Sequence, residues 1–141
     1  MPIRTAQAQW NGDLRSGSGH MRFGGGAFDG AYSFDSRFGD GKGTNPEELI
    51  AAVHAGCFSM AAAGALTRAG HPPTNIDTTA NVLIEQKPEG FRITSIALTT
   101  TAVVPGIDAA QFQTIAEEAK KNCPVSVALS AVNITLTASL K

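Results

Sequence analysis

One stretch of the sequence constrains the fold more than any other, the alanine-rich run "GTNPEELIAAVHAGCFSMAAAGALTRAGH". Pro46 stands near its start, and Gly70 closes it shortly before Pro72 and Pro73. Proline at the start and glycine at the end of an apolar run are helix boundary signals in the correct order. We predict a helix of about 24 residues that is apolar almost all round, as a buried central helix would be.

Predicted strands lie on both sides of this helix. The first 43 residues contain three short segments separated by glycines, which is typical of antiparallel strands joined by turns. After the helix, residues 76–86 and 91–104 are rich in Thr, Val and Ile, and "KPEG" between them indicates a hairpin. A second helix is predicted from Asp108, a short third one from Pro124, and a half-buried strand over residues 133–140. This order predicts an α+β fold.

Composition limits the class of protein. The chain has 141 residues, of which 43% are hydrophobic and 16% charged, so we expect one globular domain over residues 1–141. A net charge of −1 offers no basic surface for nucleic acid or an anionic membrane. The N-terminus lacks an apolar signal core, and no run approaches the roughly 18 apolar residues of a membrane span. We therefore predict a cytoplasmic protein with neither a nucleic-acid nor a membrane partner.

The chain has only two cysteines, and each sits in a distinctive place. Cys57 falls within the long predicted helix among apolar residues, where a buried core thiol is the commonest explanation. Cys123 precedes Pro124 and is predicted to be a helix N-cap, where unpaired N–H groups lower the pKa of a thiol. The simpler alternative is a small residue that only caps the helix. In a reducing cytosol, both could be buried thiols, metal ligands or redox groups.

Two charged residues, one at the start of the long helix and one in the segment before it, are candidate functional groups. Asn45 is the predicted cap of that helix, and Glu48 can close a capping box with it. Glu47 has no such local role, so its carboxylate is free to pair with a cation. Arg37 lies in a glycine-rich loop between two phenylalanines, where a guanidinium can be held partly buried and its charge less screened.

Two alternative functions are compatible with these residues. His54 and Cys57 are three residues apart on one helix face, and with Cys123 they could bind zinc. A zinc hydrolase is therefore one alternative, although no second pair of residues has the spacing of metal ligands. A non-catalytic stress-related binding protein with the same fold is another.

The motifs together resemble those of the OsmC/Ohr family, in particular its osmotically inducible protein C branch. The resemblance rests on "GTNPEELIAAVHAGCFSMA", on the "RF" pair upstream, and on "VPGID" and "CPVSVAL" downstream, and it covers nearly the whole chain. It implies a thiol peroxidase that reduces organic hydroperoxides, and hydrogen peroxide less efficiently, in oxidative or osmotic stress defence. It also implies antiparallel strands around a long central helix that carries Cys57, in an intertwined homodimer with active sites at the subunit boundary.

The resemblance assigns a role to each candidate. Cys57 is the expected peroxidatic cysteine and Cys123 the resolving one, so the cycle passes through a Cys57–Cys123 disulfide. Arg37 is expected to stabilise the thiolate and the transition state, and Glu47 to orient Arg37, whereas His54 is expected to be structural. An external dithiol of the lipoyl or thioredoxin type would regenerate the thiols, and no cofactor or metal is implied.

The substrate pocket is expected to be apolar. Two phenylalanines flank the arginine, and two large apolar residues lie beside the first cysteine, which suits alkyl or aryl hydroperoxides. These predicted lining residues are Phe34, Phe38, Phe58 and Met60.

Overall fold

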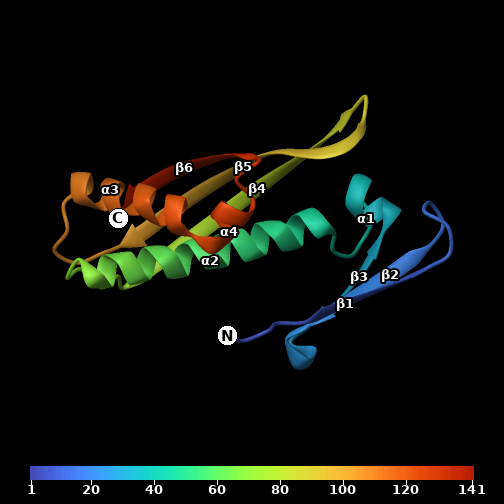
Figure 1. Ribbon diagram of the computed structural model, residues 1–141, viewed down its shortest axis with the longest axis horizontal. Coiled ribbons are helices and arrows are strands. Elements are labelled where there is room, and N and C mark those ends of the chain that lie inside the picture. The colour runs from blue at the N-terminus through green and yellow to red at the C-terminus, as the bar shows by residue number, and fades with distance from the viewer. The chain divides into compact units, whose positions relative to one another are not determined.

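The computed structural model describes residues 1–141 and divides them into two compact units (Figure 1). The N-terminal unit is Met1–Leu49 and the C-terminal unit is Ile50–Lys141. Each contains a three-stranded sheet, and the helices make the fold a mixed α+β one, as predicted. The expectation of a single domain concerns how the two units associate, and it stays a prediction.

The N-terminal unit is built on an antiparallel sheet in the order β1-β2-β3. The three predicted strands are confirmed, and the glycine triplet forms a short 3-10 turn between the last two. The elements are β1 (Ala6–Asn11), β2 (Ser18–Phe23), η1 (Gly24–Gly26), β3 (Phe28–Ser33) and α1 (Phe34–Phe38).

Helix α1 corrects the expectation that Arg37 lies in a loop. Ser33 is its N-cap: the Ser36 amide donates to Ser33 Oγ at 3.1 Å, and the Ser33 amide donates to Ser36 Oγ at 2.8 Å. This reciprocal pair satisfies amides at the helix start, so one helical turn forms before the glycine-rich segment begins. Arg37 is therefore on a short capped helix and not on a free loop.

The C-terminal unit combines a sheet in the order β4-β5-β6 with three helices. Strands β4 and β5 form the predicted antiparallel hairpin, but β5 and β6 are parallel, which corrects the expectation of antiparallel strands throughout. Two helices between β5 and β6 return the chain to the end of the sheet where β5 began, as a parallel connection requires. The elements are α2 (Pro46–Arg68, starting in the N-terminal unit), β4 (Asn75–Lys87), β5 (Gly90–Val103), α3 (Ala109–Asn122), α4 (Pro124–Ala128) and β6 (Asn133–Leu140).

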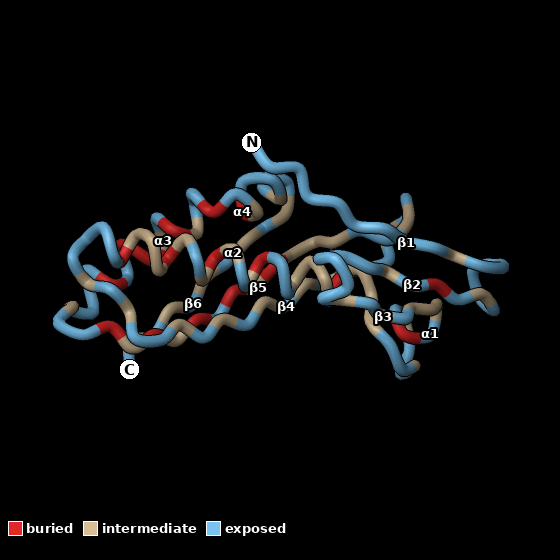
Figure 2. Tube along the Cα trace, turned by 90° about the horizontal axis from the view of Figure 1, so that it is seen from below, coloured by how far each residue is buried: buried red, intermediate tan, exposed pale blue.

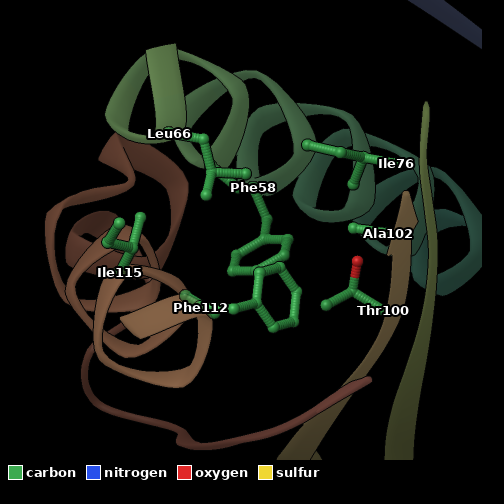
Figure 3. A pocket seen from close by; sticks show the side chains of 9 residues that line it. Phe58, Leu66, Ile76, Thr100, Ala102, Phe112 and Ile115 are labelled. Carbon is green, nitrogen blue, oxygen red and sulfur yellow. The ribbon is translucent and has the colours of Figure 1, made fainter. Parts of the chain in front are cut away.

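The core of the C-terminal unit lies between one face of its sheet and helices α2 and α3. Alternate residues of β5 are buried because they point toward the helices, and β6 shows the half-buried alternation predicted for it (Figure 2). Phe58 from α2 and Phe112 from α3 meet in this layer beside Leu66 and Ile115 (Figure 3). This layer holds α2, which carries Cys57, against α3, which ends just before Cys123.

Helix α2 buries one stripe and not its whole surface. Within the C-terminal unit, the buried side chains of α2 recur every four residues and are His54, Phe58, Ala62 and Leu66. Between them Val53 is 55% exposed and Met60 is 79% exposed. The expectation of a helix buried almost all round is therefore wrong within one chain, because only one face of α2 meets the sheet and α3.

Helix α2 also corrects the expectation about membrane spans. By length and composition alone, Pro46–Arg68 is apolar enough to cross a bilayer. This is weak evidence, because the core helix of a soluble protein passes the same test.

Truncation of the α2 stripe should destabilise the chain. Phe58 is fully buried in the core, so we expect Phe58→Ala to lower the free energy of unfolding by about 3–5 kcal/mol. Val127 is an exposed residue of α4, and Val127→Ala should change it by less than about 0.5 kcal/mol. Urea unfolding followed by circular dichroism measures both, and equal effects would contradict the packing described.

Candidate active site

The two cysteines meet in the C-terminal unit. Cys57 lies on α2, and Cys123 is the N-cap of α4, with Pro124 at the first helical position as predicted. Their Sγ atoms are 2.9 Å apart and both thiols are free. Cys57 is partly exposed, whereas Cys123 is 0% exposed. The pair therefore presents one accessible and one protected sulfur within bonding reach of each other.

The surroundings of the pair shift the pKa values of the two thiols in opposite directions. Burial, followed by the hydrogen bond to Cys123, raises the pKa of Cys57, although the Val125 amide opposes this. Burial alone would raise the pKa of Cys123 too, but hydrogen bonds from Cys57, from the Ser126 amide and hydroxyl and from the Val125 amide lower it overall. Either sulfur can hold the proton between them, and these donors favour Cys123 as the thiolate in the C-terminal unit by itself.

A buried histidine extends this polar cluster. His54 is 0% exposed on α2, and its Nε2 lies 2.8 Å from Ser126 Oγ on α4. Burial lowers the pKa of His54, so the ring is neutral at pH 7. Ser126 was not singled out from the sequence. The available signal was its place in the first turn of a helix that starts with Cys-Pro, three residues after Cys123.

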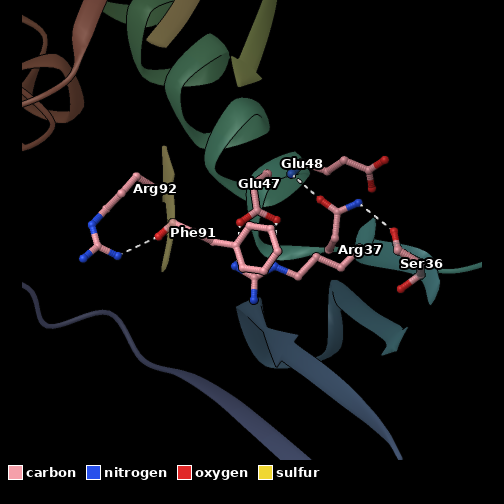
Figure 4. A network of polar contacts seen from close by, with 7 residues as sticks. Ser36, Arg37, Glu47, Glu48, Phe91 and Arg92 are labelled. Carbon is pink, nitrogen blue, oxygen red and sulfur yellow. Dashed lines mark hydrogen bonds and ion pairs between the residues drawn. The ribbon is translucent and has the colours of Figure 1, made fainter. Parts of the chain in front are cut away.

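Arg37 and Glu47 form a bidentate ion pair within the N-terminal unit (Figure 4). Arg37 Nε donates to Glu47 Oε2 at 3.1 Å, and Arg37 Nη2 donates to Glu47 Oε1 at 2.7 Å. Glu47 is only 7% exposed, so its charge is held against the guanidinium with little screening by water. The pair fixes the plane of the guanidinium.

A network of hydrogen bonds ties α1 to the start of α2 and so holds this ion pair. Ser36 Oγ donates to the Thr44 carbonyl at 2.8 Å, and Asn45 Nδ2 donates to the Ser36 carbonyl at 3.1 Å. The Thr44 amide donates to the Ala31 carbonyl at 2.8 Å. Gly43 precedes this contact with φ +127°, and a Cβ there would lie 2.6 Å from the Ala31 oxygen, so glycine is required.

The start of α2 is capped as predicted, with one difference. The Glu48 amide donates to Asn45 Oδ1 at 2.8 Å, which confirms Asn45 as the cap. The Glu48 carboxylate accepts a hydrogen bond from Thr44 Oγ1 at 3.3 Å, and not from the Asn45 amide that a capping box would use.

The four predicted lining residues lie in different environments. Phe34 and Phe38 are partly buried on α1 with ring centroids 5.0 Å apart, and Arg37 Cζ lies 5.1 Å from the Phe38 ring centroid. Phe58 belongs to the closed core and Met60 is exposed. In the C-terminal unit, Phe58 and Met60 therefore do not share one apolar surface.

The zinc alternative finds no support in the donor geometry. No group of three or more His, Cys, Asp or Glu side chains is placed to hold a metal ion. The Nε2 atom of His54 contacts Ser126 and not the two sulfurs.

The shared proton makes a testable prediction about titration. The pKa of Cys57 is raised and that of Cys123 lowered, so the thiolate absorbance of the reduced protein should rise in two separated steps. Cys57→Ser should leave a single step from Cys123. A single step of two thiolates at the ordinary cysteine pKa in the unmutated protein would contradict the contact.

Comparisons with known proteins identify the family to which the chain is similar. The family model described as OsmC-like protein matches residues 39–137. Peroxiredoxin OsmC of Escherichia coli is 49% identical over 139 residues, which are 98% of this chain and 96% of that protein. An organic hydroperoxide resistance protein of Xanthomonas axonopodis is 38% identical over 100 residues, 69% of this chain and 68% of that protein.

A solved structure agrees with the fold. The crystal structure of an organic hydroperoxide resistance protein OsmC from Legionella pneumophila matches with a TM-score of 0.71 and 24% identity. The match covers 100% of this chain and 99% of that one. On the family model and the identities, the chain belongs to the OsmC-like protein family, as the sequence motifs predicted.

Proposed function

We propose that the chain is a thiol-dependent peroxidase that reduces organic hydroperoxides with Cys57 and Cys123. The observation that supports this most is the 2.9 Å approach of an accessible thiol to a buried one. The relatives named Peroxiredoxin OsmC and organic hydroperoxide resistance protein support the same class of activity. Defence against oxidative or osmotic stress is the role we infer.

The reaction starts at the more accessible sulfur. The Cys57 thiolate attacks the terminal peroxide oxygen, the O–O bond breaks, and the alkoxide takes a proton and leaves as an alcohol. Cys57 is then a sulfenic acid. The Cys123 thiolate attacks its sulfur, the S–O bond breaks, and hydroxide takes a proton and leaves as water. The product is a Cys57–Cys123 disulfide, which an external dithiol of the lipoyl or thioredoxin type reduces.

Activation of Cys57 needs a cation. Burial raises the pKa of Cys57 in its own unit, so the surrounding apolar groups disfavour the thiolate that the reaction needs. We propose that Arg37 supplies the missing charge, stabilising the thiolate and the oxygen that leaves. Glu47 would hold the guanidinium in one orientation through the two-pronged contact already described.

We further propose that a second copy of the chain completes each active site. Glu47 and Cys57 are ten positions apart on α2, which separates them by about 15 Å along a straight helix. They therefore cannot both touch one small substrate group from the same helix. The exposed apolar face of α2, with Val53 and Met60, would be covered in a homodimer whose α2 helices pack across the two-fold axis.

The substrate surface is inferred from the side chains around Arg37. Phe34 and Phe38 offer aromatic surface next to the guanidinium, and Met60 offers a flexible apolar side chain on α2. We propose that these residues favour alkyl and aryl hydroperoxides over hydrogen peroxide. Phe58 would act indirectly, by fixing α2 from within the core. A cytoplasmic location remains part of the proposal.

Peroxidase activity should depend on Arg37 as well as on the Cys57 thiol. With dithiothreitol as reductant, we expect Cys57→Ser to abolish consumption of cumene hydroperoxide. Arg37→Ala should lower its rate by about 10²-fold or more, and Arg37→Lys should restore only part of it. Circular dichroism controls for folding. Full activity of Arg37→Ala would remove Arg37 from the site, and an inactive wild type would favour the binding-protein alternative.

Sharing of the site between two chains predicts complementation. Glu47→Ala and Cys57→Ser proteins should each be inactive as homodimers. Mixed under denaturing conditions and refolded together, they should form heterodimers with one intact site and recover part of the activity. Native mass spectrometry establishes that heterodimers form. Heterodimers without activity would place Glu47 and Cys57 of each site on the same chain.

A further inference from the structure

The proposed catalytic cycle gives no role to His54 and Ser126, although both are buried on the helices that carry the two cysteines. A fully buried histidine bonded to a buried serine on another helix is an arrangement that needs a reason, because burial of polar groups is costly unless they are satisfied. Nε2 of His54 has a partner in Ser126 Oγ, whereas Nδ1 is buried without one. The asymmetry of the two ring nitrogens determines how the ring is protonated.

The proton of the neutral His54 ring belongs on Nε2. A buried N–H without an acceptor is rarer in proteins than a buried acceptor without a donor, so the unpartnered Nδ1 carries the lone pair. Nε2–H therefore donates to Ser126 Oγ. With its oxygen accepting from His54, the Ser126 hydroxyl is free to donate its own proton.

That proton is available to the second cysteine. Ser126 lies in the first turn of α4, three residues after Cys123, and both side chains are buried. Hydrogen bonding by the Ser126 hydroxyl is one of the causes that lower the pKa of Cys123, whose Sγ lies 2.9 Å from Cys57 Sγ. The four side chains form one line in the C-terminal unit, from His54 through Ser126 and Cys123 to Cys57. With the ring proton on Nε2, the donors of His54 and Ser126 follow one another toward Cys123, which is the direction that favours a thiolate there.

We propose that His54 and Ser126 are positioning residues that stabilise Cys123 as the leaving thiolate when the Cys57–Cys123 disulfide is reduced. The proposal rests on the proposed peroxidase cycle. It also sets the direction of reduction, because Cys57 is the accessible sulfur and Cys123 the buried one. An incoming thiolate therefore attacks Cys57.

Reduction of the disulfide takes two thiol–disulfide exchange steps. One thiolate of the external dithiol bonds to Cys57 Sγ, the Cys57–Cys123 bond breaks, and its electron pair leaves on Cys123. The second thiolate of the reductant then attacks the reductant sulfur that is bonded to Cys57, and Cys57 leaves as a thiolate. The dithiol is oxidised to a disulfide, the two cysteines are reduced, and the two protons of the dithiol pass to them. Reduction is faster when the leaving thiol has a lower pKa, which is what the Ser126 hydroxyl provides.

The alternative is that His54 and Ser126 only tie α2 to α4. Both explanations predict some loss of stability when the contact is removed. Only the proposal predicts that the hydroxyl changes the chemistry of Cys123, so the test measures that chemistry directly.

The first test compares three variants oxidised with diamide, so it does not depend on peroxidase activity. Ser126→Ala removes the hydroxyl, Ser126→Thr retains it, and Ser59→Ala removes a hydroxyl of α2 that contacts Thr78 and neither cysteine. We expect dithiothreitol to reduce the disulfide about tenfold more slowly in Ser126→Ala, and at close to the wild-type rate in the other two. Equal rates in Ser126→Ala and wild type would overturn the proposal.

The second test measures the ionisation of Cys123 and the protonation of His54 without any catalytic turnover. In a Cys57→Ser background, adding Ser126→Ala should move the thiolate titration of Cys123 to higher pH, and adding Ser126→Thr should not. Nitrogen NMR of the wild type should find the proton of His54 on Nε2. An unmoved titration, or a proton on Nδ1, would overturn the proposal. A wild type that consumes no hydroperoxide would instead overturn the proposed function, and both tests of the line would still give a result.

Discussion

The contact between Cys57 and Cys123 depends on how α2 and α4 are held, and the core of the C-terminal unit holds them. Phe58 follows Cys57 on α2 and is fully buried against the sheet and α3. Ala119, one turn before Cys123, is buried in the same cluster. Phe58 is the residue next to Cys57, and the Cys123 amide donates to the Ala119 carbonyl at 2.8 Å, so the backbone of each cysteine is tied to the core. The apolar core thus supports the 2.9 Å approach of the two sulfurs.

Burial near the same core affects the ionisation of the two thiols differently. Apolar surroundings raise the pKa of Cys57, whereas Cys123 keeps local donors that lower its own. Those donors are Cys57 itself, the Ser126 amide and hydroxyl, and the Val125 amide at the start of α4. In the proposed mechanism, the positive charge that activates Cys57 comes from the Arg37 guanidinium, which Glu47 holds in one orientation.

Much of this arrangement could be predicted from the sequence, because it is encoded locally. Pro46 and Gly70 marked the ends of α2 to within two residues, and Asp108 caps α3 through the Gln111 amide as expected. Helix α1 was missed because a five-residue helix has no hydrophobic periodicity, and its signal is only the serine pair at 33 and 36. The parallel pairing of β6 could not be read from its alternation, which is the same in either direction.

The long-range contacts of the site were less accessible. The proximity of the thiols and the Arg37–Glu47 pair followed from family motifs, because no local pattern relates residues 66 positions apart. His54 was interpreted as structural, since a sequence does not show which nitrogen of a buried ring finds a partner. The partial exposure of α2 was also missed, because its composition is apolar on every face whereas the sheet and α3 cover only one.

The central claim is that Cys57 and Cys123 act as one redox pair. The most direct measurement is intact and peptide mass spectrometry of the reduced protein after one equivalent of cumene hydroperoxide. The account predicts the loss of two hydrogens and a linked peptide pair that contains Cys57 and Cys123. Oxidation of Cys57 to a sulfinic acid with Cys123 still free would contradict it.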